Sequence, residues 1–322
     1  MKKCGFQELG SVGSNGKAKR GRYLMTSMNP EILDFFPALS RNVLNDNSLI
    51  PVIPLYLGKK VYCNYVYHNS KYCGSEAKHK RNEYRIYLNG ELENNQLLFC
   101  AEDIVVIREG TISSNSELQK VYFLDLVSDH TSGEYIQLSK TIEEYPINGG
   151  YGIFEGELPD FEERVGNILD ANNELIPVLD KKVESVLEKN DNISHSLFNA
   201  GNFRDFVLIG YRNRCALTDD FIDASSGNRL DVVYIRPVEN GGQSHPNNGI
   251  AFVPSIAQAF VRGQFTLTDD FEVVVHPLCN DADLWIYDSC QIKVPSNVLF
   301  RPSRDNIIFH RKNIFGAFAS VK

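Results

Sequence analysis

The stretch from Phe203 to Gly263 decides the fold of the carboxy-terminal part of the chain. It begins FRDFVLIGYRNRCALTD (203–219), continues through LDVVYIRP (230–237) and ends NNGIAFVPSIAQAFVRG (247–263). Apolar residues between Phe203 and Ile209 predict an amphipathic helix before the turn that contains Cys215. A short apolar strand, a loop rich in Gly and Asn, and a second short helix near Phe260 follow. The sequence therefore predicts a β-hairpin framed by two helices.

Four blocks of this stretch resemble the HNH family of restriction-type endonucleases, whose pattern runs roughly CAxTG, AHIxP, NGLxL and HxxFDxG. The matching residues are Cys215, Ala216, Thr218, Ile235, Pro237, Asn248, Gly249, Phe260 and Gly263. The resemblance covers roughly residues 197–316, because the segment 291–315 also resembles the family's Pro-containing strand and His-Arg-aromatic tail. It implies an HNH-like (ββα-metal) domain with flanking helices and strands, in which a β-hairpin and a helix present one metal ion to a phosphate.

The residues that carry the chemistry of that family are replaced in this chain. Tyr234 stands where the family has its general-base His, and Ala257 and Val261 stand where it has a metal-ligand His and an Asp. Imidazole takes a proton from water near neutral pH, whereas tyrosine, with an ordinary pKa of about 10, does so poorly. Alanine and valine offer no ligand to Mg²⁺. We therefore expect an HNH-like fold without catalysis and without a cofactor, with Mg²⁺ needed only if the nuclease is active.

Three further residues keep the nuclease hypothesis open. His245, in GGQSHPNNG, could serve as a base from a neighbouring loop, or could face solvent. Asn248 orients the loop in active family members, so its presence is also compatible with a structural role. Asp231 could bind a metal ion or simply end the strand. The catalytic candidates are thus Tyr234, Asn248 and His245, and Asp231 is the candidate metal ligand.

Positive charge is concentrated near the amino end of the chain. Residues 1–85 carry 14 Lys and Arg against 6 Asp and Glu, whereas residues 86–322 carry 19 against 35. Such asymmetry indicates polyanion binding by the basic part. No GxxxxGK[ST] phosphate loop, Ser-His-Asp arrangement or PD…ExK nuclease pattern accompanies it.

Two basic clusters interrupt segments that alternate like strands. The candidate DNA-binding residues in them are Ser14, Asn15, Lys17, Lys19, Arg20 and Arg22 in the first, and Lys71, Lys78, Lys80 and Arg81 in the second. Cations of this kind contact phosphates and base edges, although an isolated basic loop can equally be solvated. Paired strands are expected within 50–67, a half-buried strand in NEYRIYL (82–88), and two more strands within 101–128.

The amino-terminal part resembles the DNA-recognition domain of the EcoRII type of restriction enzyme, a pseudobarrel shared with plant B-three transcription factors. A Gly-rich basic arm, NEYRIYL, CAEDIVVIRE and VYFLDLV carry the resemblance over roughly residues 5–140. It implies an all-β pseudobarrel in which two arms clamp the major groove. The arms would be Ser14–Arg22 and roughly Lys71–Arg81.

These observations predict an α+β protein of two domains. Residues 1–145 would form the pseudobarrel, 146–196 a linker with an amphipathic helix over Asn173–Asn190, and 197–322 the HNH-like domain. The expected function is sequence-specific binding of double-stranded DNA by a restriction or defence-type protein. The alternatives are an active Mg²⁺-dependent endonuclease and an RNA- or protein-binding scaffold. A palindromic target would imply a homodimer.

The cellular setting follows from what the sequence lacks. No run of eighteen apolar residues and no signal-peptide pattern is present, and seven cysteines occur without CxxC spacing. Such a chain is expected to have reduced thiols, no membrane partner and a cytoplasmic location.

Overall fold

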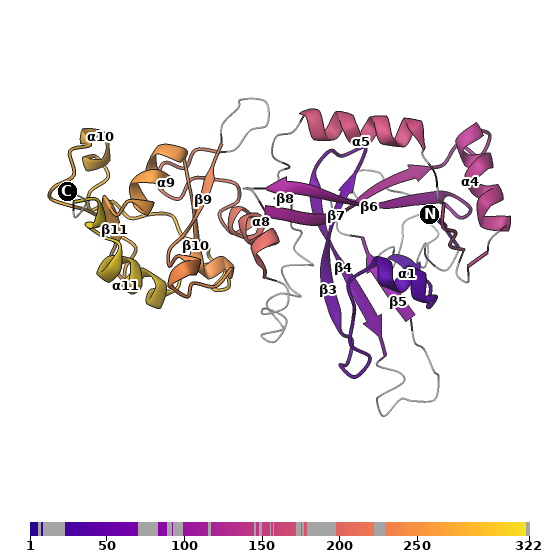
Figure 1. The fold of residues 1–322 in the computed structure, drawn as a ribbon, viewed down its shortest axis with the longest axis horizontal. Helices are drawn as coiled ribbons and strands as arrows, with labels where there is room; N and C mark the ends of the chain where they lie inside the picture. Colours follow the sequence, from indigo (N-terminus) through magenta and orange to yellow (C-terminus); the bar gives the residue numbers. More distant parts are fainter. Residues whose placement is uncertain are drawn as a thin grey trace, which may run out of the picture. The chain divides into compact units, whose positions relative to one another are not determined.

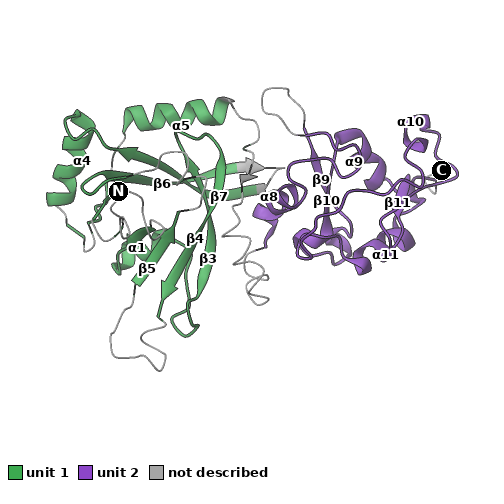
Figure 2. Cartoon of the chain, turned by 180° about the vertical axis from the view of Figure 1, so that it is seen from behind, with its two compact units in different colours: residues 1–113, 118–193 green, residues 114–117, 194–322 purple. Residues whose placement is uncertain are grey.

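The structure is a computed structural model. It describes residues 1–5, 8, 23–69, 83–88, 92, 99–114, 117–144, 146–147, 150–154, 156, 158–171, 175, 177–178, 198–221 and 229–319. The chain divides into two compact units, residues 1–113 with 118–193, and residues 114–117 with 194–322 (Figure 2). The described elements are of mixed α+β type.

The first unit is built on one curled sheet (Figure 1). Its strands are β1 (Lys2–Lys3), β2 (Tyr23–Thr26), β3 (Asn47–Pro54), β4 (Lys60–His68), β5 (Glu83–Tyr87), β6 (Ile104–Ser114), β7 (Glu117–Val127) and β8 (Pro177–Val178). The order in the sheet is β1-β6-β7-β3-β4-β5-β2, with β8 beside β4. The pairs β3–β7 and β4–β8 are parallel, whereas β1–β6, β2–β5, β3–β4 and β4–β5 are antiparallel.

Alternating side chains of the strands supply two separate hydrophobic cores. In β7, Tyr122 and Leu124 belong to one core, and Val121 and Phe123 belong to the other. This alternation is the expected one, because successive residues of a strand point to opposite faces of a sheet. The predicted strands within 50–67, 82–88 and 101–128 are confirmed as β3 and β4, β5, and β6 and β7.

Helices cover both faces of this sheet, so the unit is not all-β as the sequence suggested. Helix α1 (Pro30–Phe35) joins the first core, and α4 (Gly133–Glu144) and α5 (Pro159–Ala171) join the second. In α4 the buried residues Tyr135, Leu138 and Ile142 share one side of the helix. Helix α5, within the segment expected to be a linker, buries Phe161 and Val165 in the same core.

The prediction of a helix over Asn173–Asn190 is wrong at Pro177 and Val178, the two residues of this range whose secondary structure is described. Pro177 and Val178 form β8, which pairs in parallel with Lys60 and Val61. Proline has no backbone N–H and disfavours a helix interior, which explains a strand at this place. Apart from Leu175, the other residues of that segment lie outside the described part of the chain.

The second unit places a hairpin between helices. Its elements are α8 (Ala200–Gly210), β9 (Asp231–Tyr234), β10 (Gly249–Phe252), α9 (Pro254–Val261), β11 (Phe265–Leu267), β12 (Val273–Val275), α10 (Ala282–Trp285) and α11 (Arg304–Asn313). Short 3-10 turns occur at Val238–Asn240, Pro246–Asn248 and Ala317–Ala319. Asn199 caps the start of α8, because its side chain accepts from the backbone N–H of Asn202 in a reciprocal capping box. The helix-strand-strand-helix order expected from 203–263 is confirmed.

Among the helices of the described residues, none has the length and apolar character that crossing a membrane requires.

Candidate functional site

The hairpin β9–β10 and helix α9 carry the residues that the sequence singles out. Tyr234, the last residue of β9, pairs with Gly249, the first residue of β10. Asn248 directly precedes β10, so Tyr234 and Asn248 lie at the same end of the hairpin, where the loop 235–248 connects the two strands. Helix α9 follows β10 after one residue and brings Ala257 and Val261.

A polar contact and a ring stack fix the side chain of Tyr234. Its hydroxyl lies 2.9 Å from Oγ of Ser244, at hydrogen-bond distance. Its ring stacks on the ring of Phe203 from α8, with centroids 4.0 Å apart. The side chain of Tyr234 is therefore a phenol fixed against an apolar neighbour.

The Asn248 side chain holds the loop 235–248 in shape. Its Oδ1 accepts from the backbone N–H of Arg236 at 2.9 Å, and its Nδ2 donates to the carbonyls of Arg236 at 2.9 Å and Gln243 at 3.0 Å. The residue is 1% exposed. Its buried amide thus satisfies three backbone groups of the loop, which is a structural role.

His245 lies near Tyr234, and Asp231 does not. The ring of His245, next to Ser244 in the chain, packs edge-on against Phe198 with centroids 4.6 Å apart. Asp231 pairs with Phe252 at the opposite end of the hairpin, about 10 Å away along the strand. Its carboxylate accepts from Nε of Arg229 at 3.0 Å. The hairpin therefore brings together Tyr234, Asn248 and His245, without Asp231.

The α9 positions offer no ligand to a metal ion. Ala257 is buried with 2% exposure, whereas Val261 is 58% exposed. Within the described ranges, no group of three or more His, Cys, Asp or Glu side chains could hold a metal ion. One phenol with two aliphatic side chains does not fit the oxygen and imidazole coordination of Mg²⁺.

The residues that match the HNH pattern hold the fold together. Sγ of Cys215 lies 3.4 Å from the backbone N–H groups of Thr218 and Val253, and so connects the turn after α8 to the start of α9. At Gly249, a Cβ would lie 2.3 Å from Cγ2 of Val207, so only glycine lets α8 pack this closely on β10.

Phe260 and Gly263 bind the end of α9 to α11. The ring of Phe260 stacks on His310 with centroids 3.9 Å apart. The His310 ring also contacts Oγ1 of Thr266 at 3.0 Å and donates from Nε2 to the Phe260 carbonyl at 3.1 Å. Burial lowers the pKa of His310 to about 4. At Gly263 φ is +73°, and a Cβ would lie 2.0 Å from the carbonyl oxygen of Ile314.

Asp219 differs from the HNH-like sequence pattern at a position whose backbone is left-handed. Asp219 stands where the first block of the family has glycine, and its φ is 64°. Glycine adopts this conformation readily, and aspartate is one of the residues that tolerate it. Lys293 lies 2.5 Å from the Asp219 carboxylate and lowers its pKa. The backbone shape that the family's glycine favours is thus present without the glycine.

All ten candidate DNA-binding residues lie outside the described part of the chain. They are Ser14, Asn15, Lys17, Lys19, Arg20, Arg22, Lys71, Lys78, Lys80 and Arg81. The structure does describe the residues that flank both basic segments, 9–22 and 70–82.

The buried carboxylate of Glu8 closes the base of segment 9–22. It accepts from the backbone N–H of Gly5 at 2.8 Å and from that of Met25 in β2 at 2.6 Å. It also pairs with Lys2 at 3.3 Å, and both side chains are 3% exposed. The residues before and after this segment are therefore fixed to each other.

Asn69 anchors the start of segment 70–82. Its Oδ1 accepts from the backbone N–H of Asn45 at 2.8 Å, and its Nδ2 donates to the carbonyl of Val43 at 2.8 Å. The residue is 1% exposed. Directly before it, His68 of β4 pairs with Glu83 of β5, so the residues before and after this segment are also held together.

Sequence reasoning missed Phe203, Ser244, Glu8 and Asn69 as determinants of the site. The sequence indicated Phe203 only as one of the apolar residues of a predicted amphipathic helix. The other three act through contacts between segments far apart in the chain, for which the sequence has no local signal.

Comparison with known proteins gives distant structural similarity. No protein-family model and no curated protein matches the chain. Among solved structures, the chain is similar to a modification-dependent TagI restriction endonuclease, at 14% identity and a TM-score of 0.29. The alignment covers 79% of this chain and 62% of the other, so this chain spans about three fifths of the solved chain that it matches.

Proposed function

We propose that the chain binds double-stranded DNA through its first unit, and that its second unit is an HNH-like nuclease fold that has lost its hydrolytic site. The recognition domain of this proposal corresponds to the first compact unit, and the nuclease-like domain to residues 197–322.

One observation carries the second half of the proposal. At the hairpin and α9, the pattern residues with structural contacts are present, and those with chemical roles are replaced. Cys215, Asn248 and Gly249 each make a contact that shapes the unit. The general-base position is a stacked phenol, and the two ligand positions are Ala257 and Val261. Selection for the fold without selection for hydrolysis explains this division.

The attachment of the two basic segments supports DNA binding. Segment 9–22 leads into Tyr23, which pairs with Tyr87, and segment 70–82 leads into Glu83. The two segments therefore join the sheet at opposite ends of β5, which are about 13 Å apart at the rise of a strand. Both basic segments thus join the same sheet, which allows them to contact one duplex.

The experiment is a fluorescence-anisotropy titration of labelled duplex DNA at several salt concentrations. A variant with alanine at Arg20, Arg22, Lys80 and Arg81 should bind more weakly, and its salt slope should fall by about one for every cation that binds a phosphate in the natural chain. Lys140→Ala, an exposed cation on α4, is the matched control. Unchanged affinity in the quadruple variant contradicts the proposal, and the stoichiometry shows whether two copies bind one duplex.

An active endonuclease is the second candidate, and the proximity of Tyr234, Ser244 and His245 favours it. Plasmid cleavage in Mg²⁺ or Mn²⁺ that disappears in Tyr234→Phe would establish this function instead.

A scaffold for RNA or protein is the third candidate function. Competition among duplex DNA, RNA and heparin at two salt concentrations separates it from DNA recognition.

A gain-of-function variant tests the loss of the site directly. Tyr234→His, Ala257→His and Val261→Asp together supply the residues that the family pattern has at these positions. We expect this variant to bind Mn²⁺ in calorimetry, and the natural chain not to bind it. Equal Mn²⁺ binding by both proteins would contradict a lost site.

A further inference from the structure

The first unit contains a pocket beside strand β6, with a cavity volume of about 410 Å³. Strand β1 pairs with Ile104 and Val105 of β6, and the pocket lies along the following residues, 106–109. It is lined by residues of α1 and α5 and by residues 151–154, 156 and 158. A cavity therefore occurs where the edge strand ends, and its size is that of ordinary small-molecule sites.

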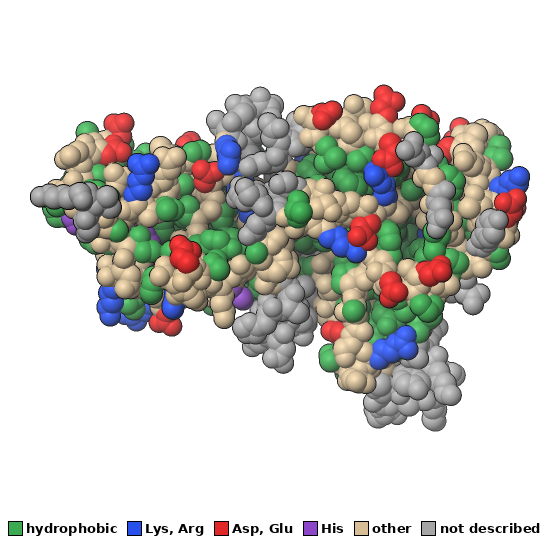
Figure 3. Space-filling model, viewed as in Figure 1, with side chains coloured by type: hydrophobic (Ala, Val, Ile, Leu, Met, Phe, Trp, Pro, Cys, Tyr) green, Lys and Arg blue, Asp and Glu red, His purple; other side chains and the backbone are tan. Residues whose placement is uncertain are grey.

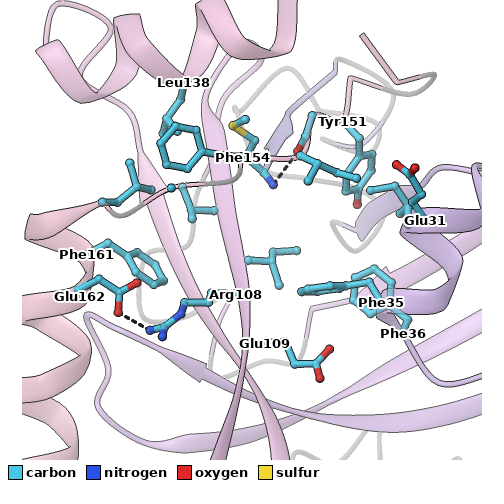
Figure 4. A pocket seen from close by; sticks show the side chains of 18 residues that line it. Glu31, Phe35, Phe36, Arg108, Glu109, Leu138, Tyr151, Phe154, Phe161 and Glu162 are labelled. Atoms are coloured by element: carbon cyan, nitrogen blue, oxygen red, sulfur yellow. Dashed lines mark hydrogen bonds and ion pairs between the residues drawn. The ribbon is translucent and has the colours of Figure 1, made fainter. Parts of the chain in front are cut away.

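Aromatic rings face each other across this pocket. Phe35 and Phe36 line it from α1, and Phe154 and Phe161 line it from the other side (Figure 4). The α1 rings are fixed, because they pack edge-on with centroids 5.1 Å apart. The hydroxyl of Tyr122 also donates to the Phe35 carbonyl at 2.9 Å. The rings on the α1 side are thus held in place before any ligand arrives.

Carboxylates dominate the charge among the residues that line the pocket. Glu31, Glu109 and Glu162 contribute three carboxylates, and Lys120 pairs with Glu109 at 2.7 Å. Arg108 already pairs with Glu162. Figure 3 shows further acidic side chains along α5, the helix that carries Glu162. Among the described ion pairs, none involves Glu31, so Glu31 supplies the excess negative charge at the pocket.

We propose that this pocket binds a small organic cation, an alkylated ammonium attached to an apolar or aromatic group. Aromatic faces attract a cation through the ring quadrupole, and carboxylates near the same space add charge attraction. The apolar remainder of the lining, from Ile32, Val106 and Leu138, takes up the uncharged part of such a molecule. The site lies wholly within the first unit and does not depend on the proposed DNA binding.

The test is isothermal titration calorimetry on the full chain with defined probes. These are benzyltrimethylammonium, choline, and neohexanol, in which carbon replaces the nitrogen of choline. We expect both cations to bind, with choline about tenfold tighter than its neutral isostere. Equal affinity for choline and neohexanol, or no binding of either cation, would overturn the proposal.

Two variants probe the two parts of the site. Glu31→Gln removes an exposed carboxylate and should weaken the cations about threefold while leaving neohexanol unchanged. Phe35→Leu removes an aromatic face, keeps an apolar side chain, and should weaken the cations about fivefold. The matched control is Glu144→Gln, on α4 and outside the pocket, which should change nothing. An equal drop in affinity in Glu31→Gln and Glu144→Gln would show general charge attraction and contradict a site.

Discussion

The rings of Tyr234 and Phe203 lie parallel, with an interplanar angle of 1° and centroids 4.0 Å apart. Phe203 belongs to α8 and Tyr234 ends β9, so the stack joins the helix to the end of the hairpin. Under the proposed HNH-like fold, Tyr234 occupies the general-base position and makes a packing contact there.

Tyr234→Phe should lower stability slightly, and Tyr234→Leu should lower it more. The first removes the hydrogen bond with Ser244, at a cost of about 1 kcal/mol. The second also removes the stack, at a further cost of about 1 kcal/mol. Trp285 is the only tryptophan of the chain and lies in the second unit, so its fluorescence during urea unfolding is the measurement. In a Ser244→Ala background, Tyr234→Phe should have no effect; a full effect there would contradict the hydrogen bond.

Asn248→Ala should destabilise the second unit by about 3 kcal/mol, since it leaves three backbone groups of the loop without their partner. Asn248→Asp should also destabilise, because a carboxylate cannot donate to the carbonyls of Arg236 and Gln243. Asn247→Ala is the matched control from the neighbouring residue. Equal unfolding midpoints for Asn247→Ala and Asn248→Ala, read from Trp285 fluorescence, would show that the amide does not hold the loop.

Gly249→Ala should destabilise by about 2 kcal/mol, because its Cβ would meet Val207 at 2.3 Å and Phe203 at 2.8 Å. Val207→Ala creates space at the closest approach. The double variant should therefore be more stable than the sum of the two single effects predicts. Strict additivity in urea unfolding would mean that the clash is relieved elsewhere.

The second unit should lose stability in mild acid through His310. Its pKa is about 4 in the folded chain against an ordinary value of 6.5, so the unfolded chain takes up the proton first. Stability is complete above about pH 6.5 and falls by roughly 3 kcal/mol as pH decreases to 4. His310→Gln should be less stable at pH 7 but should depend less on pH over this window. Parallel curves for both proteins would rule out His310 as the cause.

Asn69→Ala should weaken DNA binding because it changes the position of segment 70–82 and leaves the charge of the segment unchanged. It removes the hydrogen bonds to Val43 and Asn45 that fix the start of segment 70–82. We expect affinity to fall while the salt slope stays constant, whereas Lys80→Ala should reduce the slope by about one. This prediction rests on the proposed DNA binding. A reduced slope in Asn69→Ala, measured by anisotropy, would show instead that fewer phosphates are bound.

The sequence predicted those parts of the fold that have a local period. Alternation in residues 82–88 predicted β5, and the apolar spacing after Phe203 predicted α8. Helix α5 has the same kind of period in Phe161 and Val165, but glycine, proline and acidic residues around it favoured a linker. That Phe161 and Val165 pack in a core with residues of the sheet depends on tertiary structure.

Of the candidate site, the sequence predicted some residues but not their contacts. The resemblance of the blocks selected Tyr234 and Asn248, and the structure places both at one end of the hairpin. It did not show what each side chain contacts. The separation of Asp231 from Tyr234, the partner Ser244, and the long-range anchors Glu8 and Asn69 depend on tertiary packing.

The closed bases of the two basic segments have a consequence for the evolution of such proteins. Glu8 and Asn69 lie just outside the stretches that they bracket, so residues between the brackets can be exchanged while the brackets themselves persist. Lengthening a loop whose ends are already tethered costs little entropy. Under the proposed DNA binding, exchange of residues 9–22 or 70–82 between related chains would change target preference and leave the sheet unchanged.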